Sequence, residues 1–289
     1  MIATGARMAN RLSAPVPAER LRIVRTLTFG YASAWLLARV VYVWDTASLP
    51  ARRFEPIGVL APLTDPPARP VVMMVWAVAL ASAVMVTVGR AVRLHAPVAA
   101  VSLLLVTTLT NAFGQIFHTE HLLVLHAIVL AAAALLEPER GRVEVAGWPL
   151  RLMMLIVVTA YVVAGVAKLR FGGMAWLDGD VLRSHVAYDN LRKVLVGDVH
   201  SPVGGRLSGE GWLWAPIAWT TLVLEFGAPA ALLPGRVRLA WIAAAWVFHL
   251  GILVLMAILF PYQLSGVAFA AFLPVERIWR LGRAPLPSG

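Results

Sequence analysis

The side chain with the clearest capacity for chemistry in this sequence is the amine of Lys168, in the stretch AYVVAGVAKLRFGGMAWLDGD over residues 160–180. Lysines at the ends of membrane spans usually extend their amines to the lipid headgroups. An amine held in a low-dielectric pocket instead loses its proton more easily and can act as a base. Small residues at Ala164, Gly165 and Ala167 would let a neighbouring helix pack closely here. The sequence therefore leaves two interpretations of Lys168 open, a charged end of a span and a buried base.

Two more ionisable side chains lie inside apolar runs, where an uncompensated charge is costly and a function is the default expectation. Glu225 is in the middle of TTLVLEFGAPAALLP, where a lone carboxylate would be either protonated or paired. A structural pair with an arginine such as Arg39, which lies within the first apolar run, is one interpretation, and a functional acid is the other. His249 in AWVFHLGIL is suited either to a hydrogen bond between helices or to proton transfer and ligand contact.

The stretch FHTEHLLVLHAIVL places His118, His121 and His126 on one broad face of a helix. A histidine pair spaced three apart can bind a metal, but the chain has neither an HExxH motif nor a cysteine, and no third ligand is evident. We therefore predict no metal site and expect these histidines to line the bundle. The run before them carries three polar side chains on one face, spaced four apart and suited to line a polar cavity: Thr107, Asn111 and Gln115.

The composition indicates what kind of protein these groups belong to. Hydrophobic residues make up 60% of the 289 positions, charged residues 14%, and the mean hydropathy is +0.78. Soluble domains are only about 45–50% apolar and about 25% charged, so we predict an integral membrane protein. The formal charge of +10 is spread in short basic clusters between apolar runs, which suits anionic lipid headgroups and argues against nucleic acid. The absence of cysteine excludes disulfides and thiolate chemistry.

The apolar runs predict an all-α polytopic bundle, since a span needs about 20 mostly apolar residues. We predict about eight transmembrane helices, or about six to seven if the fourth or the eighth is re-entrant. We divide the last long apolar stretch at Phe260-Pro261, because proline breaks or kinks a helix. The predicted spans are 22–44, 71–89, 97–117, 119–136, 149–168, 212–234, 238–259 and 261–275.

Basic residues predict the orientation of this bundle, because Lys and Arg gather in cytoplasmic loops. With the N-terminus in the cytoplasm, every predicted inner segment is basic. These segments carry Arg90 and Arg93, then Arg140, Arg142 and Arg151, then Arg236 and Arg238, and finally Arg277, Arg280 and Arg283. We therefore expect a multi-pass protein of the cell (inner) membrane, with both termini in the cytoplasm and no signal peptide. The predicted parts are a cytoplasmic segment 1–20, a transmembrane domain 21–276 and a disordered basic tail 277–289.

After the fifth span, Gly172-Gly173 is predicted to break the helix. The long outer loop 169–211 then contains a predicted amphipathic helix over 175–197. In WLDGDVLRSHVAYDNLRKVLVG, apolar residues recur close to a 3.6-residue period. They are Leu177, Val181, Tyr188, Leu191 and Leu195. We expect this helix to lie on the outer membrane face, where Trp176 would anchor it at the interface.

The predicted orientation also places several polar side chains toward one end of the bundle. The outer ends of their spans carry His118, Glu120, His121 and Lys168, and Glu225 and His249 lie deeper. Polar side chains inside a bilayer face the bundle interior or a water-filled cavity. This layout therefore predicts an outward-facing pocket within the membrane.

Several segments resemble the HTTM family, the horizontally transferred transmembrane domain, whose members include the vitamin K-dependent gamma-carboxylase. The lysine segment is similar to this family's pattern Y-x-x-A-G-x-x-K-L followed by W-x-x-G. The matching residues are Tyr161, Ala164, Gly165, Lys168, Leu169, Trp176 and Gly179. EHLLVL at 120–125 resembles the family's Asn-His segment and places His121, while FHLGILVLMAILFPYQLSGVAF resembles its Phe-His segment and places His249. Glu225 stands where relatives often carry an intramembrane acid.

The resemblance implies a multi-helix membrane fold with a pocket toward the outer side, in which Lys168 is the base that deprotonates a reduced, vitamin K-like quinone. His121, His249 and Glu225 would support this base. The side chains that would contact the quinone are Asn111, Gln115, Tyr161 and Trp176. The chain departs from the carboxylase at Glu120, where the carboxylase has asparagine, and in carrying no large lumenal domain after the last predicted span.

Three functions remain open from the sequence. The first is a pocket for a quinone-like or other lipid-soluble ligand, with carboxylation or quinol oxidation as the candidate reaction. The second is a non-catalytic membrane factor that helps to mature or export a secreted peptide, which would contact the helix at 175–197 and the outer loops. The third is a small transporter, although we find no inverted repeat of the kind that many transporters have.

Overall fold

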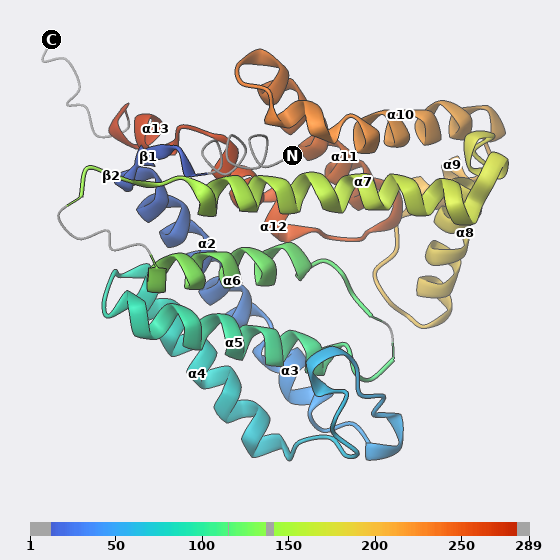
Figure 1. Cartoon of the computed structure of the whole chain (residues 1–289). Coiled ribbons are helices and arrows are strands. Elements are labelled where there is room, and N and C mark those ends of the chain that lie inside the picture. Colours follow the sequence, from blue (N-terminus) through green and yellow to red (C-terminus); the bar gives the residue numbers. More distant parts are fainter. Residues whose placement is uncertain (1–12, 115, 137–141, 282–289) are drawn as a thin grey trace, which may run out of the picture. The chain divides into compact units, whose positions relative to one another are not determined.

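The computed structural model describes residues 13–114, 116–136 and 142–281, and the prediction of an all-α protein is confirmed for them. Helices make up almost all of the regular structure in these residues (Figure 1). The two strands found there, β1 (Pro15–Pro17) and β2 (Glu144–Ala146), have three residues each. The chain divides into two compact units, Met1–Met153 with Leu273–Gly289 and Met154–Phe272. The first unit thus contains both ends of the chain.

The first unit is built on the hairpin of α4 (Arg69–Thr87) and α5 (Val92–Thr110). The hairpin turns tightly at Gly89, whose φ of 74° is one that glycine adopts without strain. α2 (Ala18–Ala38) packs against α4, and α6 (His121–Leu136) packs against α5 and α2 (Figure 1). The other elements are α3 (Val40–Thr46), η1 (Ala51–Arg53), η2 (Gly58–Leu60) and α13 (Val275–Leu281).

Within the first unit, a strand pair holds β1 to the segment before α7, and two ion pairs hold the start of α2 to α13. β1 pairs with β2 in an antiparallel ladder. Arg20 donates hydrogen bonds of 2.8 and 2.6 Å to the two carboxylate oxygens of Glu276, and Arg280 forms an ion pair with Glu19. The hydrogen bond from Arg20 holds the pKa of the Glu276 carboxyl below its usual value. The start of α2 and the helix α13 therefore lie together, and the side of a membrane on which the two termini lie stays a prediction.

α7 (Trp148–Leu177) runs from the first unit into the second. Its regular geometry is interrupted at Gly173, where φ is 55° and ψ is −141°. That backbone conformation is open to glycine and strained for other residues, so the predicted break at Gly172-Gly173 is confirmed. The remaining elements of the second unit are α8 (Asp180–Leu195), α9 (Pro202–Leu207), η3 (Gly211–Leu213), α10 (Trp214–Phe226), η4 (Ala228–Leu232), α11 (Arg236–Met256), α12 (Pro261–Leu264) and η5 (Val267–Phe272).

Four helices in the described residues are long and apolar enough to cross a membrane, namely α4, α5, α7 and α11. α2 and α3 make a fifth if the pair, bent by 58° at Arg39, is counted as one span. The predicted count of about eight spans is therefore not confirmed. α6 has only 16 residues, and the run predicted at 212–234 is divided at Gly227 between α10 and the 3-10 helix η4.

The predicted eighth span, 261–275, is wrong as a continuous helix. This segment forms the four-residue α12 and the 3-10 helix η5, and between them Gly266 has a φ of 77°. The division of the long apolar stretch before Pro261 is confirmed, because α11 ends at Ala257, whose φ is 50°. Hydropathy finds apolar residues here, whereas left-handed backbone and proline decide where the helices end.

The predicted amphipathic helix in the loop after α7 is present as α8. Its first apolar residues, Val181 and Leu182, pack together with Leu177 of α7 against a buried cluster of Trp176, Ala218 and Leu222. Its later apolar residues, Tyr188, Leu191 and Leu195, are exposed. Protein therefore covers only part of the apolar stripe, and a position on the membrane surface stays a prediction.

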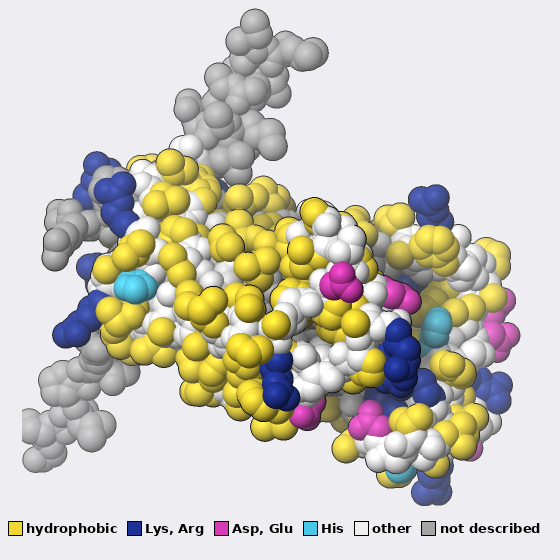
Figure 2. All heavy atoms as spheres, turned by 90° about the horizontal axis from the view of Figure 1, so that it is seen from below, with side chains coloured by type: hydrophobic (Ala, Val, Ile, Leu, Met, Phe, Trp, Pro, Cys, Tyr) yellow, Lys and Arg dark blue, Asp and Glu magenta, His cyan; other side chains and the backbone are white. Residues whose placement is uncertain are grey.

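Apolar side chains dominate the surface of the candidate spans. Figure 2 shows hydrophobic side chains over most of one face of the molecule. In α11 only 17% of the most apolar stretch is buried inside the protein, and in α4 the corresponding share is 28%. Exposed apolar surface of this extent marks a contact with membrane or protein rather than with water. This supports a lipid bilayer as the surroundings of these helices.

Candidate functional site

The second unit brings α7 and α10 into close contact at Gly165. A Cβ atom on this residue would lie 3.2 Å from the Cβ of Glu225 and 3.2 Å from the ring of Phe226. Both distances are tighter than ordinary van der Waals contact, so the bare backbone of glycine allows this approach. As a result the carboxylate of Glu225 reaches the face of α7 that carries Lys168, less than one turn further along the helix.

Lys168 and Glu225 form an ion pair between Nζ and Oε1. The Glu225 side chain is 2% exposed and the Lys168 side chain 21% exposed, so most of the surface of the pair is buried inside the protein. The amine of Lys168 is therefore directed at a buried carboxylate and not outward to headgroups, and its role as a base stays a prediction. The suggested pairing of Glu225 with Arg39 is wrong, since Arg39 forms an ion pair of 3.6 Å with Glu120 in the first unit.

Trp176 contributes an aromatic face to the same site. Its ring centroid lies 5.4 Å from Lys168 Nζ, a distance at which an ammonium is attracted to the ring. The kink at Gly173 changes the direction of the last turn of α7, and Trp176 then packs on Ala218 and Leu222 of α10. A carboxylate and an indole therefore lie beside the amine.

Two buried polar atoms in this site have no hydrogen-bond partner among the described residues. They are Oε2 of Glu225, an acceptor, and Nε1 of Trp176, a donor. Buried polar atoms are nearly always paired, and an unpaired one in a native protein requires an explanation such as a bound water or ligand. A molecule that offers both a donor and an acceptor near Lys168 would satisfy both atoms.

A second polar pair joins α7 to α11. Tyr161 Oη and His249 Nε2 are 2.8 Å apart, and both side chains are buried. The Tyr161 ring also meets Trp241 edge to face at 4.9 Å, while His249 lies 4.8 Å from the ring of Phe260. Tyr161 precedes Lys168 by seven residues, which places the two on one face of α7. The second unit thus carries two adjacent polar pairs within an apolar environment.

Sequence reasoning missed a third polar group, which we name the α11 cap and which consists of Asn190, Lys193 and Ser201. Lys193 Nζ donates to the carbonyl of Met256 at 2.5 Å, Asn190 Nδ2 to that of Leu255 at 2.9 Å, and Ser201 Oγ to that of Val254 at 2.5 Å. These are last-turn carbonyls that a helix cannot satisfy internally. No sequence signal marks the cap, because its donors and acceptors are more than fifty residues apart.

The cap is tied to its own helix by Asp189. Its Oδ2 lies 2.8 Å from Lys193 Nζ, and its Oδ1 lies 3.0 Å from Arg192. Burial raises the pKa of Asp189, but the hydrogen bonds and charges of Lys193 and Arg192 outweigh burial and hold that pKa below its usual value. The carboxylate therefore stays charged and keeps Lys193 in place at the end of α11.

The predicted site residues of the first unit have other surroundings. The amide of Asn111 makes two hydrogen bonds to the backbone of Phe117, at 3.1 and 2.9 Å, which is a structural role. Gln115 lies outside the described residues. His121 is exposed, with its ring 6.5 Å from that of His118. A shared site of His121 with Lys168 stays a prediction.

Glu120 and His126 complete the picture of the predicted polar groups. The Glu120 carboxylate accepts hydrogen bonds from Trp35 Nε1 at 3.3 Å and from Thr119 Oγ1 at 2.5 Å. With Arg39 also beside it, this carboxylate is satisfied within the first unit. His126 is fully buried. Among the described residues, no three His, Asp or Glu side chains are grouped so as to hold a metal ion.

Comparison with known proteins gives one match. A family model described as the HTTM domain matches residues 15–276. This range begins in β1 and ends in α13, so a single match covers both units. Neither the curated proteins nor the solved structures include a significant match to this chain.

Proposed function

The chain belongs to the HTTM family, and from this membership we propose that it is a membrane protein whose second unit binds a lipid-soluble hydroxyl compound, with Lys168 as the base that takes its proton. A reduced, vitamin K-like quinone is the candidate compound. The observation that carries the proposal is the buried pair of Lys168 and Glu225 beside two unpaired polar atoms.

The pair supplies a way to make a neutral amine. A buried ion pair is costly to desolvate, and transfer of the ammonium proton from Nζ to Glu225 Oε1 removes both charges. The neutral Nζ then has a lone pair with which to accept the proton of a bound hydroxyl group. Glu225 is thus the acceptor of the first proton, and Lys168 is the base for the second.

The residues present fit a hydroquinone. Oε2 of Glu225 can accept from a hydroxyl group and Nε1 of Trp176 can donate to an oxygen, so the two unpaired atoms match a group that is both donor and acceptor. When bound, a reduced quinone would supply a weakly acidic hydroxyl group and the electrons for an oxidation. Tyr161 lies on the same face of α7 as Lys168 and is held by a hydrogen bond with His249. Its side chain would close the deep end of the site.

The position in the cell follows from the charge distribution. The basic segments between the apolar runs favour the cytoplasm for both termini, and ion pairs hold the start of α2 against α13 in the first unit. The proposal therefore places the protein in the cell membrane, with the end of α7 that carries Lys168 toward the outer side.

Purification in detergent followed by mass spectrometry of bound lipophilic molecules tests this function. We expect the wild type to retain a quinone, and Lys168→Ala and Glu225→Gln to lose it. Arg170→Ala is the matched control, because Arg170 is an exposed cation two residues after Lys168 and lies outside the pair. Equal retention of the quinone by Lys168→Ala and the control would overturn the proposal.

A non-catalytic role in peptide maturation or export has one observation in its favour, the exposed apolar stripe of Tyr188, Leu191 and Leu195 on α8. A peptide partner would cover this stripe. In that case Leu191→Ser would abolish maturation or export of the peptide in cells, whereas Lys168→Ala would leave it intact. A larger effect of Lys168→Ala than of Leu191→Ser would instead support Lys168 as the base.

A further inference from the structure

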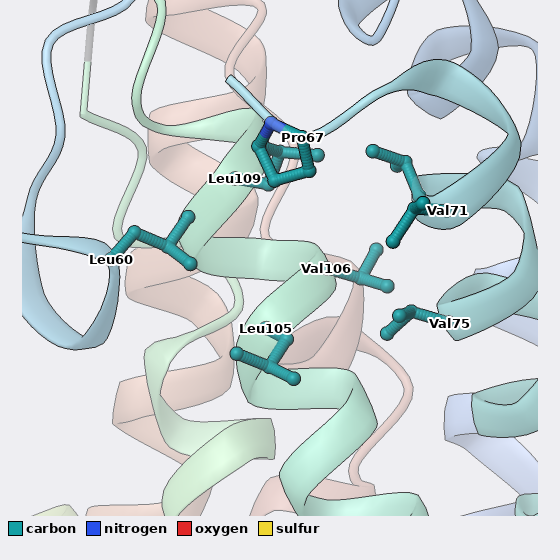
Figure 3. A pocket seen from close by; sticks show the side chains of 8 residues that line it. Leu60, Pro67, Val71, Val75, Leu105, Val106 and Leu109 are labelled. Carbon is teal, nitrogen blue, oxygen red and sulfur yellow. The ribbon is translucent and has the colours of Figure 1, made fainter. Parts of the chain in front are cut away.

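A cavity of about 190 Å³ opens between α4 and α5 in the first unit. Figure 3 shows side chains from both helices and from the loop before α4 converging on it. The lining consists of Leu60, Pro67, Val71, Val72, Val75, Leu105, Val106 and Leu109. None of these side chains carries a hydrogen-bonding atom. A water in the cavity would find no polar side-chain partner, so the cavity favours hydrocarbon.

The loop that forms one wall is fastened to the residues that follow α5. The backbone N–H of Glu55 donates to the carbonyl of Ala112 at 2.8 Å, and the rings of Phe54 and Phe113 are 5.4 Å apart. Gly58 opens η2 with a φ of 52°, and Leu60 at the end of η2 then points into the cavity. One wall of the cavity is thus built by a loop that is held in place.

The surroundings of the cavity are apolar as well. α4 and α5 are both long and apolar enough to span a membrane, so their outer faces meet lipid chains. A dry apolar cavity of about 150 Å³ is large enough to bind benzene. A cavity of about 190 Å³ therefore takes a short length of a hydrocarbon chain from the adjoining lipid.

A cation at the start of α4 is close in the chain to two residues that line the cavity. Arg69 lies two residues from both Pro67 and Val71 in the chain, and it is exposed. Its guanidinium is 4.2 Å from the ring centroid of Trp44, and its Nη1 donates to Ser48 Oγ at 3.1 Å. Both partners are uncharged, so the positive charge is left for an anion. An exposed tryptophan beside an arginine at a helix end is typical of the lipid headgroup level.

We propose that this cavity binds one acyl chain of an anionic phospholipid, whose phosphate group is held by Arg69. The apolar lining selects the chain, and the arginine selects the charged headgroup over a neutral lipid. The site is in the first unit and is separate from the Lys168 site, so it stands or falls independently of the proposed function. The isoprenoid tail of a quinone is the competing occupant.

Native mass spectrometry of the purified full chain, titrated with dioleoyl-phosphatidylglycerol, tests the proposal. We expect one tightly held lipid on the wild type. Leu105→Trp fills the cavity with a larger side chain and weakens this binding by about tenfold or more. Val101→Trp is the matched control, because Val101 lies one turn earlier on α5, is 57% exposed and does not line the cavity.

Arg69→Gln tests the headgroup without altering the packing. The loss of one basic residue near the membrane surface weakens the binding of phosphatidylglycerol by about fivefold. Arg90→Gln, at the far end of the α4–α5 hairpin, leaves it unchanged. The proposal is overturned if Leu105→Trp and Val101→Trp bind the lipid equally, or if the molecule retained in the cavity is an isoprenoid quinone. Circular dichroism of each variant establishes that it is folded.

Discussion

The ion pair between Lys168 and Glu225 predicts a large energetic coupling between these two residues. Removing one partner of a buried ion pair costs about 3–5 kcal/mol, because the other charge is left unpaired. Lys168→Met leaves a carboxylate that is 2% exposed, so we expect a loss of about 3 kcal/mol of unfolding free energy. Glu225→Gln leaves an ammonium that is 21% exposed and partly screened, so we expect about 2 kcal/mol.

The double variant separates the pair from the loss of packing. With both charges removed no group is left unpaired, so we expect Lys168→Met with Glu225→Gln to lose about 2–3 kcal/mol, not the sum of about 5. The coupling energy is then about 2–3 kcal/mol. The assay is reversible unfolding in mixed micelles with increasing dodecyl sulfate, followed by circular dichroism. Arg170→Met combined with Glu225→Gln is the control cycle and should be additive. If the losses of unfolding free energy in the Lys168 cycle are additive, the energetic coupling between Lys168 and Glu225 is refuted.

Three further predictions concern the packing around the site and the ends of the chain. Gly165→Ala forces α7 away from Glu225 and should lower the unfolding free energy by about 1–3 kcal/mol. Gly251→Ala is the control and should not lower it, because no atom lies within 4 Å of the added Cβ. Equal effects of the two variants would contradict the close approach of α7 and α10. Lys193→Met removes a charged donor from the end of α11 and should cost about 1.5–3 kcal/mol in the same unfolding assay; a neutral effect would show that the α11 cap does not stabilise the helix. The pair of Arg20 with Glu276 contributes stability that is complete above the usual glutamate pKa and is lost as the pH falls through the lowered pKa of Glu276. Glu276→Gln should therefore flatten the acid side of the curve of unfolding free energy against pH, and an unchanged curve would exclude this pair as its cause.

The residues of the candidate site could be identified from the sequence one at a time, but their pairing could not. Lys168, Glu225 and His249 stand out because ionisable groups are rare in apolar runs. Glu225 has several cations within reach in sequence terms, and only the contact at Gly165 decides that its partner is Lys168 and not Arg39. The small residues Ala164 and Gly165 predicted that a neighbouring helix packs closely here, but they did not identify that helix.

The fold could be predicted in class and less well in detail. The break at Gly172-Gly173 was predictable because glycine is the residue that tolerates such a backbone. The prediction that the last apolar run is one continuous helix was wrong, because hydropathy does not detect the turn at Gly266. The α11 cap left no signal at all, since Lys193 in α8 reads as an ordinary solvated lysine until the end of α11 is placed against it.

The most direct test of the central claim, that Lys168 takes a proton from a bound hydroxyl group, is the absorption spectrum of a lipophilic naphthol in the site. The anion of a naphthol absorbs at longer wavelength than the neutral form. At neutral pH we predict the anion spectrum for the naphthol bound to the wild type, and the neutral spectrum for the naphthol bound to Lys168→Met. A neutral spectrum on the wild type, or the same anion spectrum on both proteins, would contradict the role of Lys168 as the base.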